Sequence, residues 1–238
     1  MTAAELPAGV EAAAPWAFKA AANGAAVAFA GRGMAGSREQ VLTRLTGDRR
    51  QVAWARQVHS ARVLRAQPGD CGEGDALVSR DGDLALSIVT ADCVPVLLAG
   101  PSAIAAAHAG WRGIAAGVVG ATVAAMEEDP ESLQAWIGPA IGPCCYETGP
   151  DVAARVAAAS DPAIVVEGPA GRPHLDLQLA VRRQLQAAGL NRIEALELCT
   201  RCEAATLHSY RREGKGAGRN HALIWTPPGN TLRPVLGD

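Results

Sequence analysis

The residues best suited to chemistry in this chain are one cysteine and two histidines, each beside a short apolar run. Cys93 stands in the turn Ala-Asp-Cys-Val-Pro, His108 follows after fourteen intervening residues, and His59 closes the segment Arg-Gln-Val-His. A thiolate beside imidazoles suits either a cysteine nucleophile with a general base or the ligand set of a soft metal. Three ligands with an open fourth position are typical of a catalytic zinc site. Since buried histidines and cysteines are also ordinary core residues, spacing alone leaves the choice open.

Other side chains could bind a substrate near these positions. Arg32 lies in the turn Gly-Arg-Gly and Arg112 follows His108 closely. A guanidinium suits phosphate because its planar fork donates paired hydrogen bonds. For Arg112, a structural ion pair or a solvated position at a helix start is an equal alternative. Tyr146 and Glu147 end a loop rich in proline and glycine, where a ring and a carboxylate could hold a base and accept its proton.

The remaining cysteines, histidines and arginines receive simpler interpretations. Cys144 and Cys145 are adjacent and are interpreted as packing residues. The Cys-x-x-Cys pair at 199–202 resembles half a zinc ribbon, but no second pair lies at ribbon spacing, so we interpret it as a turn near the site. His174 and His221 have no motif around them and are expected to be structural or exposed. The arginines of the segment 208–212 are expected to form an exposed basic loop.

The elements that position these residues follow from apolar runs bounded by turn residues. The runs 94–99 and 103–107, separated by Gly-Pro-Ser, predict a hairpin that would bring Cys93 and His108 to the same end of a sheet. Further strands are predicted at residues 25–30, 51–58, 61–66, 76–79, 84–90, 133–137, 193–198 and 221–225.

Helices are predicted at 37–45, 114–126, 151–159 and 177–188. Ser37 and Gln40 have the spacing of a capping box, and Asp176 and Gly189 suit the start and stop of the last helix. Residues 71–75 are expected to form a loop. No repeat or long linker interrupts the pattern, so we expect an α+β protein with a single domain over residues 1–238.

Composition excludes several classes of function. The net charge is −2 with no basic stripe, which argues against nucleic-acid binding. The longest uncharged run, 94–111, is interrupted by prolines and a glycine, which argues against a membrane span. The N-terminal segment lacks a cationic start followed by an apolar run, so no secretory signal is expected. Six cysteines without such a signal indicate reduced thiols and a cytoplasmic location. Oligomeric state is left open.

Four sequence blocks, QVHS, TADCVP, AHAGWRG and IGPAIGPCCYE, occur in this order. They resemble the signature blocks of the YfiH/laccase-domain family, whose members were once described as multicopper polyphenol oxidases. The resemblance spans about residues 32–225, and four ordered blocks are far more specific than one motif. It implies a metal held by His59, Cys93 and His108. It also implies two mixed β-sheets flanked by helices, similar to deamidating bacterial toxins.

The family resemblance also implies a function. That function is a zinc-dependent purine nucleoside phosphorylase acting on adenosine, inosine and methylthioadenosine, with adenosine deaminase activity and with copper as the alternative metal. Nucleosides and phosphate would be the ligands. One departure is the segment Gly-Arg-Gly-Met-Ala-Gly-Ser around Arg32, which lacks the family's fuller glycine-rich segment and its Ser-Leu-Asn block. The loop over the substrate is therefore expected to be shorter. The block Gly-Asp-Ala-Leu retains Asp75.

Three alternatives compete with this function. A Cys-His amidase acting on a peptidoglycan precursor would use Cys93 as nucleophile and His108 as base, and would not need His59. A non-enzymatic module would carry a redox-active cysteine cluster. A laccase is the weakest, because a multicopper enzyme needs more histidines than the five present here.

Overall fold

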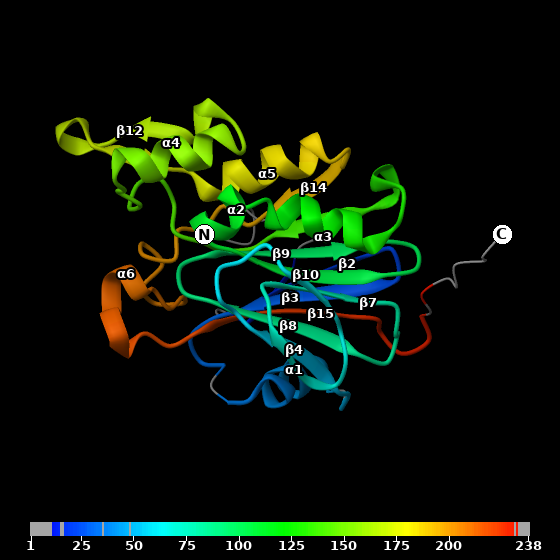
Figure 1. Ribbon diagram of the computed structural model, residues 1–238. Helices are drawn as coiled ribbons and strands as arrows, with labels where there is room; N and C mark the ends of the chain where they lie inside the picture. The colour runs from blue at the N-terminus through cyan, green and yellow to red at the C-terminus, as the bar shows by residue number, and fades with distance from the viewer. Residues whose placement is uncertain (1–10, 15–16, 35, 48, 231, 233–238) are drawn as a thin grey trace.

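The computed structural model describes residues 11–14, 17–34, 36–47, 49–230 and 232. Most of the N-terminal segment, in which no secretory signal is expected, lies outside these residues. Two stacked β-sheets form the centre of the molecule, with helices on both outer faces (Figure 1). Each sheet contains parallel and antiparallel pairs, which confirms the predicted α+β architecture of two mixed sheets flanked by helices. The prediction of one domain over residues 1–238 stays a prediction.

The first sheet has seven strands in the order β1-β2-β3-β15-β8-β4-β6. These strands are β1 (Glu11–Ala14), β2 (Ala17–Ala22), β3 (Ala25–Ala30), β4 (Val52–Arg56), β6 (Gly69–Glu73), β8 (Ala85–Thr90) and β15 (Asn220–Trp225). The second sheet has six strands in the order β14-β11-β9-β10-β7-β5. These are β5 (Val63–Arg65), β7 (Ala76–Ser79), β9 (Val94–Ala99), β10 (Ile104–Ala109), β11 (Gln134–Ile137) and β14 (Arg192–Ala195). A separate pair joins β12 (Val165–Glu167) to β13 (Pro173–Leu175).

Helices cover the outer faces of both sheets (Figure 1). Helix α1 (Arg38–Thr46) packs on the seven-stranded sheet, where Val41, Leu42 and Leu45 are buried. The six-stranded sheet is covered by α2 (Trp111–Ala115), α3 (Val118–Met126), α4 (Pro150–Ala158) and α5 (Leu177–Ala187). A short helix, α6 (Tyr210–Glu213), lies at one end of the sheets. Within the described ranges, no helix has both the length and the apolar character needed to cross a membrane.

Alternation along fully buried strands divides the core into layers. On β10, Ala105, Ala107 and Ala109 face the helices, whereas Ile104 and Ala106 belong to the layer between the sheets. Side chains that alternate in this way place both faces of the strand in apolar surroundings. Because these alanine side chains are small, helix α3 can pack closely against the sheet. Close packing of small side chains builds a substantial core although the chain has few aromatic residues.

The hairpin prediction is confirmed. Strands β9 and β10 pair antiparallel, with His108 opposite Pro95 and Ala109 opposite Val94. Because Cys93 directly precedes β9, Cys93 and His108 lie at the same end of this pair. The capping box at α1 is also confirmed, since Ser37 accepts from the Gln40 N–H while the Gln40 side chain accepts from the Ser37 N–H.

Two element predictions are wrong. The helix predicted over 114–126 is divided into α2 and α3, because Gly117 adopts a left-handed φ of 85° between them. The loop predicted at 71–75 is mostly strand β6, which pairs in parallel with β4 at the edge of the sheet. Its glycines and aspartate have low strand propensity, so pairing with β4 determines its conformation. Strands β1, β2, β12 and β13 were not predicted.

Candidate metal and active site

The three side chains singled out by their types converge at one end of the sheets. His59 follows β4, Cys93 precedes β9, and His108 lies on β10. One ligand atom from each lies within 4.8 Å of the others. The distance from Cys93 Sγ to His59 Nε2 is 3.9 Å, and the two imidazole rings meet edge to face with centroids 4.9 Å apart. These residues could therefore hold one metal ion.

The carboxylate of Asp75 orients both histidines of this group. Its carboxylate is fully buried and accepts a hydrogen bond from His108 Nδ1 at 2.8 Å. It also accepts from the backbone N–H groups of His59 at 2.9 Å and Ser60 at 2.6 Å, and from the Ser60 hydroxyl at 2.8 Å. One carboxylate thus fixes the ring of one histidine and the turn that carries the other, and it engages His108 through Nδ1 rather than Nε2.

Without a metal, the surroundings of the group favour a thiolate at Cys93 and an imidazolium at His108. Burial opposes a thiolate at Cys93, but hydrogen bonds with His108 and His59 outweigh it and lower the pKa of Cys93 to about 6. Burial likewise opposes an imidazolium at His108, yet hydrogen bonds with Asp75 and Cys93 raise the pKa of His108 to about 9. For Asp75, burial is also outweighed, and hydrogen bonds from His108 and Ser60 hold the pKa of its carboxyl well below the usual range. A thiolate is the form that binds a metal or attacks a carbonyl carbon.

Gly110 permits the close packing of the group. A Cβ placed on this glycine would lie 2.8 Å from a ring carbon of His59 and 2.9 Å from Cys93 Sγ. No other residue type fits there without displacing one of the two side chains. The glycine of the HAGWRG block therefore has a steric role beside His108.

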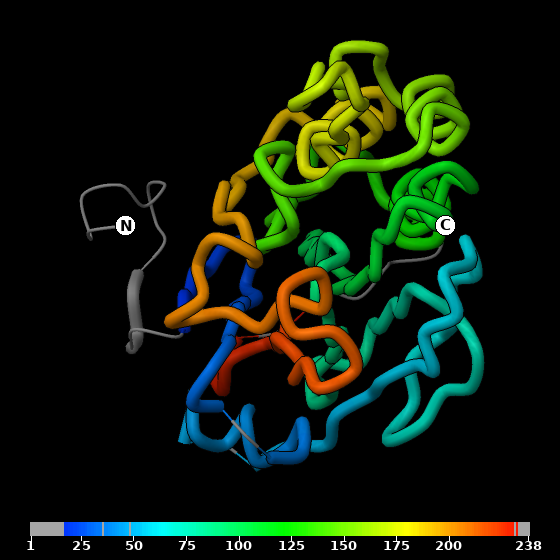
Figure 2. Tube along the Cα trace, turned by 90° about the vertical axis from the view of Figure 1, so that its left-hand side faces the viewer, coloured from blue at the N-terminus to red at the C-terminus, as the bar shows by residue number. Residues whose placement is uncertain are grey.

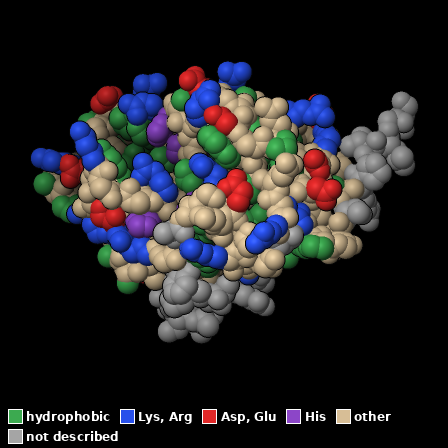
Figure 3. Space-filling view, turned by 90° about the horizontal axis from the view of Figure 1, so that it is seen from below, with side chains coloured by type: hydrophobic (Ala, Val, Ile, Leu, Met, Phe, Trp, Pro, Cys, Tyr) green, Lys and Arg blue, Asp and Glu red, His purple; other side chains and the backbone are tan. Residues whose placement is uncertain are grey.

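A cavity of about 340 Å³ opens beside His59 and Cys93. Its wall includes Tyr146, Arg211 and Arg219, contributed by segments far apart in sequence. The segment that carries α6, drawn in orange, crosses this end of the molecule (Figure 2). Seen from below, histidine side chains reach the surface among Lys and Arg side chains (Figure 3). A second cavity of about 350 Å³ adjoins His59, Cys93 and His108 on the side of Trp54.

Tyr146 and Arg211 form one wall of the first cavity. The Arg211 guanidinium lies 5.2 Å from the centroid of the Tyr146 ring, and Arg211 Nη1 donates to the Glu147 carbonyl at 3.2 Å. The Arg211 N–H donates to the side chain of Asp92, the residue before Cys93, at 2.8 Å. Burial, together with the nearby Cys93, raises the pKa of Tyr146 to about 12. Its phenol therefore stays protonated at neutral pH and can donate a hydrogen bond.

The other predicted substrate-binding residues lie elsewhere. Arg32 is ion-paired with Glu213 and its Nε donates to the Leu207 carbonyl at 3.2 Å. Arg112 is exposed, with its guanidinium 4.3 Å from the centroid of the Trp111 ring. Glu147 pairs with Arg172 at 2.8 Å.

None of these three side chains lines either cavity beside the triad. Conversely, Asp75, Gly110, Arg211 and Arg219 were not predicted as site residues. Asp75 lies in the Gly-Asp-Ala-Leu block and Gly110 lies in the HAGWRG block, so these blocks could have identified both residues.

Comparisons with known proteins agree with this fold. Residues 20–227 match the family described as multi-copper polyphenol oxidoreductase laccase. The chain is 42% identical over 198 residues to a purine nucleoside phosphorylase of Streptomyces coelicolor, covering 79% of this chain and 81% of that protein. It is 37% identical over 177 residues to the purine nucleoside phosphorylase YfiH of Escherichia coli, covering 72% of each. The crystal structure of YlmD from Geobacillus stearothermophilus matches with a TM-score of 0.81 at 28% identity, over 92% of this chain and 99% of that one.

Proposed function

We propose that this chain, which belongs to the multi-copper polyphenol oxidoreductase laccase family, is a zinc-dependent purine nucleoside phosphorylase with adenosine deaminase activity. The names of its relatives in Streptomyces coelicolor and Escherichia coli support the phosphorylase assignment. The observation that carries the proposal is the convergence of His59, Cys93 and His108 beside a cavity. His59 and Cys93 line this cavity together with Tyr146 and Arg211. Its volume of about 340 Å³ falls in the range of small-molecule sites, roughly 300–1,000 Å³.

The donor set fits zinc. Two imidazoles and one thiolate are the nitrogen and sulfur ligands that zinc prefers, and an open fourth position is typical of its catalytic sites. Asp75 supplies the carboxylate partner that zinc-binding histidines commonly have. When bound, the metal supplies Lewis-acid chemistry, stabilising negative charge that develops on the substrate.

Phosphorolysis assigns distinct tasks to the residues of the cavity. A phosphate oxygen forms a bond to C1′ of the ribose while the bond from C1′ to the purine nitrogen breaks. The purine leaves with the electron pair and gains a proton, and ribose 1-phosphate is the second product. Arg211 and Arg219 line the cavity and would hold the phosphate anion beside C1′. The ring of Tyr146 offers a face for the base, and its phenol can donate to an anion.

Arg32 and Arg112, which the sequence suggests for phosphate, remain weaker candidates because both side chains are engaged outside the cavity. Deamination requires a different nucleophile at the same bound nucleoside. A water oxygen replaces the amino group at C6 of adenosine, and inosine and ammonia are the products. One cavity could support both outcomes, depending on whether phosphate or water meets the substrate.

The direct test is to incubate zinc-replete protein with adenosine and phosphate and to identify the products by mass spectrometry. We expect adenine and ribose 1-phosphate, with inosine and hypoxanthine as deamination products. Cys93→Ser should abolish all four, because a neutral hydroxyl is a poor zinc ligand. Cys71→Ser, which changes a thiol outside the site, is the matched control and should retain them. Absence of any free base with the metal-replete wild type would refute the proposal, and free ribose in place of ribose 1-phosphate would indicate a nucleosidase.

One observation favours a second candidate. The lowered pKa of Cys93, at about 6, and its hydrogen bond with His108 suit a cysteine nucleophile in an amidase that edits a peptidoglycan precursor. Such a dyad does not require His59. If His59→Ala cleaves a peptidoglycan-derived amide at the wild-type rate but has lost the zinc of this site and its nucleoside activity, the dyad is the better description of that amide cleavage.

A further inference from the structure

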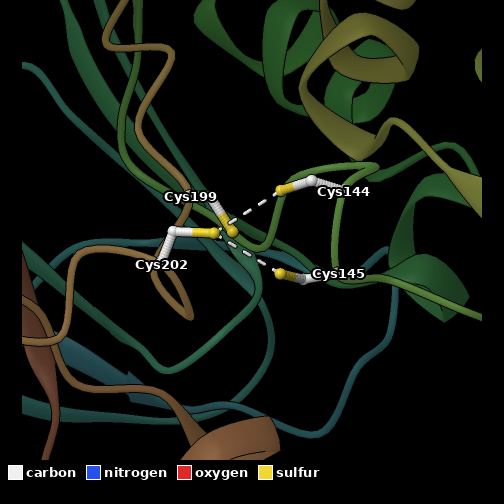
Figure 4. A group of neighbouring side chains, drawn as sticks. All are labelled: Cys144, Cys145, Cys199 and Cys202. Atoms are coloured by element: carbon white, nitrogen blue, oxygen red, sulfur yellow. Dashed lines mark hydrogen bonds between the residues drawn. The ribbon is translucent and has the colours of Figure 1, made fainter.

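A second cluster of metal-ligating side chains lies outside the proposed active site. It consists of Cys144, Cys145, Cys199 and Cys202 (Figure 4). The first two lie in the loop after β11, and the last two lie in the turn after β14. The four sulfur atoms lie within 4.8 Å of one another, and the side chains extend toward a common centre from two segments. Neither pair alone is a motif for a metal, but folding brings them together.

The spacing of the sulfur atoms suits a single tetrahedral ion. Cys202 Sγ lies 3.7 Å from Cys144 Sγ and 3.5 Å from Cys145 Sγ. A Zn–S bond of about 2.3 Å places neighbouring sulfurs of a tetrahedral site roughly 3.8 Å apart. All four cysteines are free thiols. Four thiols this close together, with Cys144 and Cys202 exposed, form a donor set for a thiophilic metal.

The backbone supports the same assignment. The N–H of Gly142 donates to Cys199 Sγ at 3.3 Å, a contact that stabilises negative charge on a thiolate. Cys199 and Cys202 have the C-x-x-C spacing of structural zinc sites, in which two ligands come from one tight turn. A set of four cysteines leaves no open position for a substrate.

We propose that Cys144, Cys145, Cys199 and Cys202 bind a structural zinc ion that is separate from the metal held by His59, Cys93 and His108. Such an ion would join the loop that lines the active-site cavity to the turn that binds Asp92, another residue of the cavity wall. The loop of Cys144 continues into Tyr146, which lines the cavity.

In the turn between Cys199 and Cys202, the Thr200 hydroxyl donates to the Asp92 side chain at 2.6 Å, directly beside Cys93. The Arg212 guanidinium bonds to the carbonyls of Thr200 and Arg201 at 2.7 Å each, which links the turn to α6. The cluster would thus hold Tyr146 and Asp92 in position.

The first measurement is the metal content of protein purified in reducing buffer with zinc, by elemental analysis and native mass spectrometry. We expect about two zinc ions per chain in the wild type if both sites are filled. The double variant Cys199→Ser/Cys202→Ser should lose one, and Cys71→Ser should lose none. His59→Ala reports on the other site and should leave the four-cysteine ion in place. These outcomes separate failure of this site from failure of the proposed active site.

Replacing zinc with cobalt gives a readout that does not depend on activity or on a folded variant. Four thiolates should give an intense thiolate-to-cobalt charge-transfer band in wild-type protein. X-ray absorption of the two-zinc form should give an average of about 2.5 sulfur ligands per zinc, because one site supplies four sulfurs and the other supplies one. Unchanged zinc content in the double variant would overturn the proposal. So would a sulfur shell limited to one thiolate. If alkylation of denatured, unreduced protein reveals disulfides among these four cysteines, they form a redox pair and not a metal site, and the proposal is overturned.

Discussion

At the scale of single residues, Asp75 supports two of the three proposed ligands although it lines neither cavity. It accepts hydrogen bonds from the backbone that carries His59 and from the ring of His108. His59 adopts a left-handed φ of 62°, an uncommon conformation for this residue type, within the turn that Asp75 binds. The carboxylate therefore stabilises both the position of one proposed ligand and the ring orientation of another.

We expect Asp75→Asn to weaken zinc binding about 10- to 100-fold, as is typical when the hydrogen-bond partner of a metal-bound histidine is changed. The amide has one acceptor oxygen instead of two and carries no charge to favour the His108 proton. Competition with a chelating indicator dye measures the affinity. Asp83→Asn, which changes an exposed carboxylate in the turn before β8, is the control. Equal zinc affinity in all three proteins would show that Asp75 acts on stability alone.

The arginines allow a second prediction at this scale. Arg211→Ala should raise the apparent KM for phosphate about tenfold, corresponding to ~1.4 kcal/mol, because a charged hydrogen bond to the anion is lost. Arg32→Ala removes a guanidinium paired with Glu213 outside the cavity and should change this KM much less. Deamination rates, which need no phosphate, should persist in both. If Arg32→Ala has the larger effect on the phosphate KM, the assignment suggested by the sequence is the correct one.

The residue types identified the proposed ligands but not their surroundings. Thiols and imidazoles are rare and chemically specific, so His59, Cys93 and His108 could be singled out from the sequence. Arg211 resembles any exposed arginine in a polar loop, and only the folded chain places it beside Tyr146. The proximity of Cys144 and Cys202 could likewise not be predicted from the sequence, because it depends on how two loops meet in the folded chain.

At the scale of elements, the sequence predicted helices and strands correctly where the residues of the segment itself determine its structure. The capping box of α1 and the hairpin of β9 and β10 depend on neighbouring residues and were predicted correctly. Strand β6 depends on its partner β4, and the left-handed Gly117 divides a continuous apolar run into α2 and α3. Such features depend on tertiary pairing or on one backbone angle, which an apolar pattern does not encode.

Helix α1 offers a prediction that concerns stability alone. Ser37→Ala should lower the free energy of unfolding by about 1 kcal/mol, because the Gln40 N–H loses its capping oxygen. Ser37→Asp keeps an acceptor at the helix start and should retain most of the stability. Urea denaturation followed by circular dichroism measures both. Because α1 packs on the face of the sheet away from β9 and β10, zinc content should be unchanged. A loss in Ser37→Asp equal to that in Ser37→Ala would mean that the cap does not stabilise the helix.

At the scale of the whole molecule, the proposed site depends on the stacking of two sheets. His59 follows β4 of the seven-stranded sheet, while His108 lies on β10 of the six-stranded sheet. Cys93 lies in the connection from β8 to β9, which passes from one sheet to the other. The ligands can meet only when the apolar layer between the sheets has formed. Metal binding should therefore be linked to global stability, since an ion that binds the folded state shifts the folding equilibrium.

The central strand β15 adds a dependence of global stability on pH. His221 is 8% exposed, and its Nδ1 has no hydrogen-bond partner among the described residues. Burial, reinforced by the charge of Arg38, lowers the pKa of His221 to about 4. The unfolded chain takes up this proton below its ordinary pKa of about 6.5, whereas the folded chain does so only near pH 4. Stability contributed by the neutral ring is therefore fully present above pH 6.5 and is lost as the pH falls toward 4.

We expect this residue to account for about 2 kcal/mol of the loss in unfolding free energy between pH 7 and pH 5. In His221→Gln the side chain does not titrate, so the variant should lose less stability than the wild type over the same interval. Urea denaturation of both metal-free proteins at the two pH values measures the difference, because other groups titrate equally in both. A parallel fall in the two proteins would mean that His221 is already protonated in the folded chain at pH 5. In that case the strand at the centre of the seven-stranded sheet would accommodate a charge, and the acid sensitivity would belong to other groups.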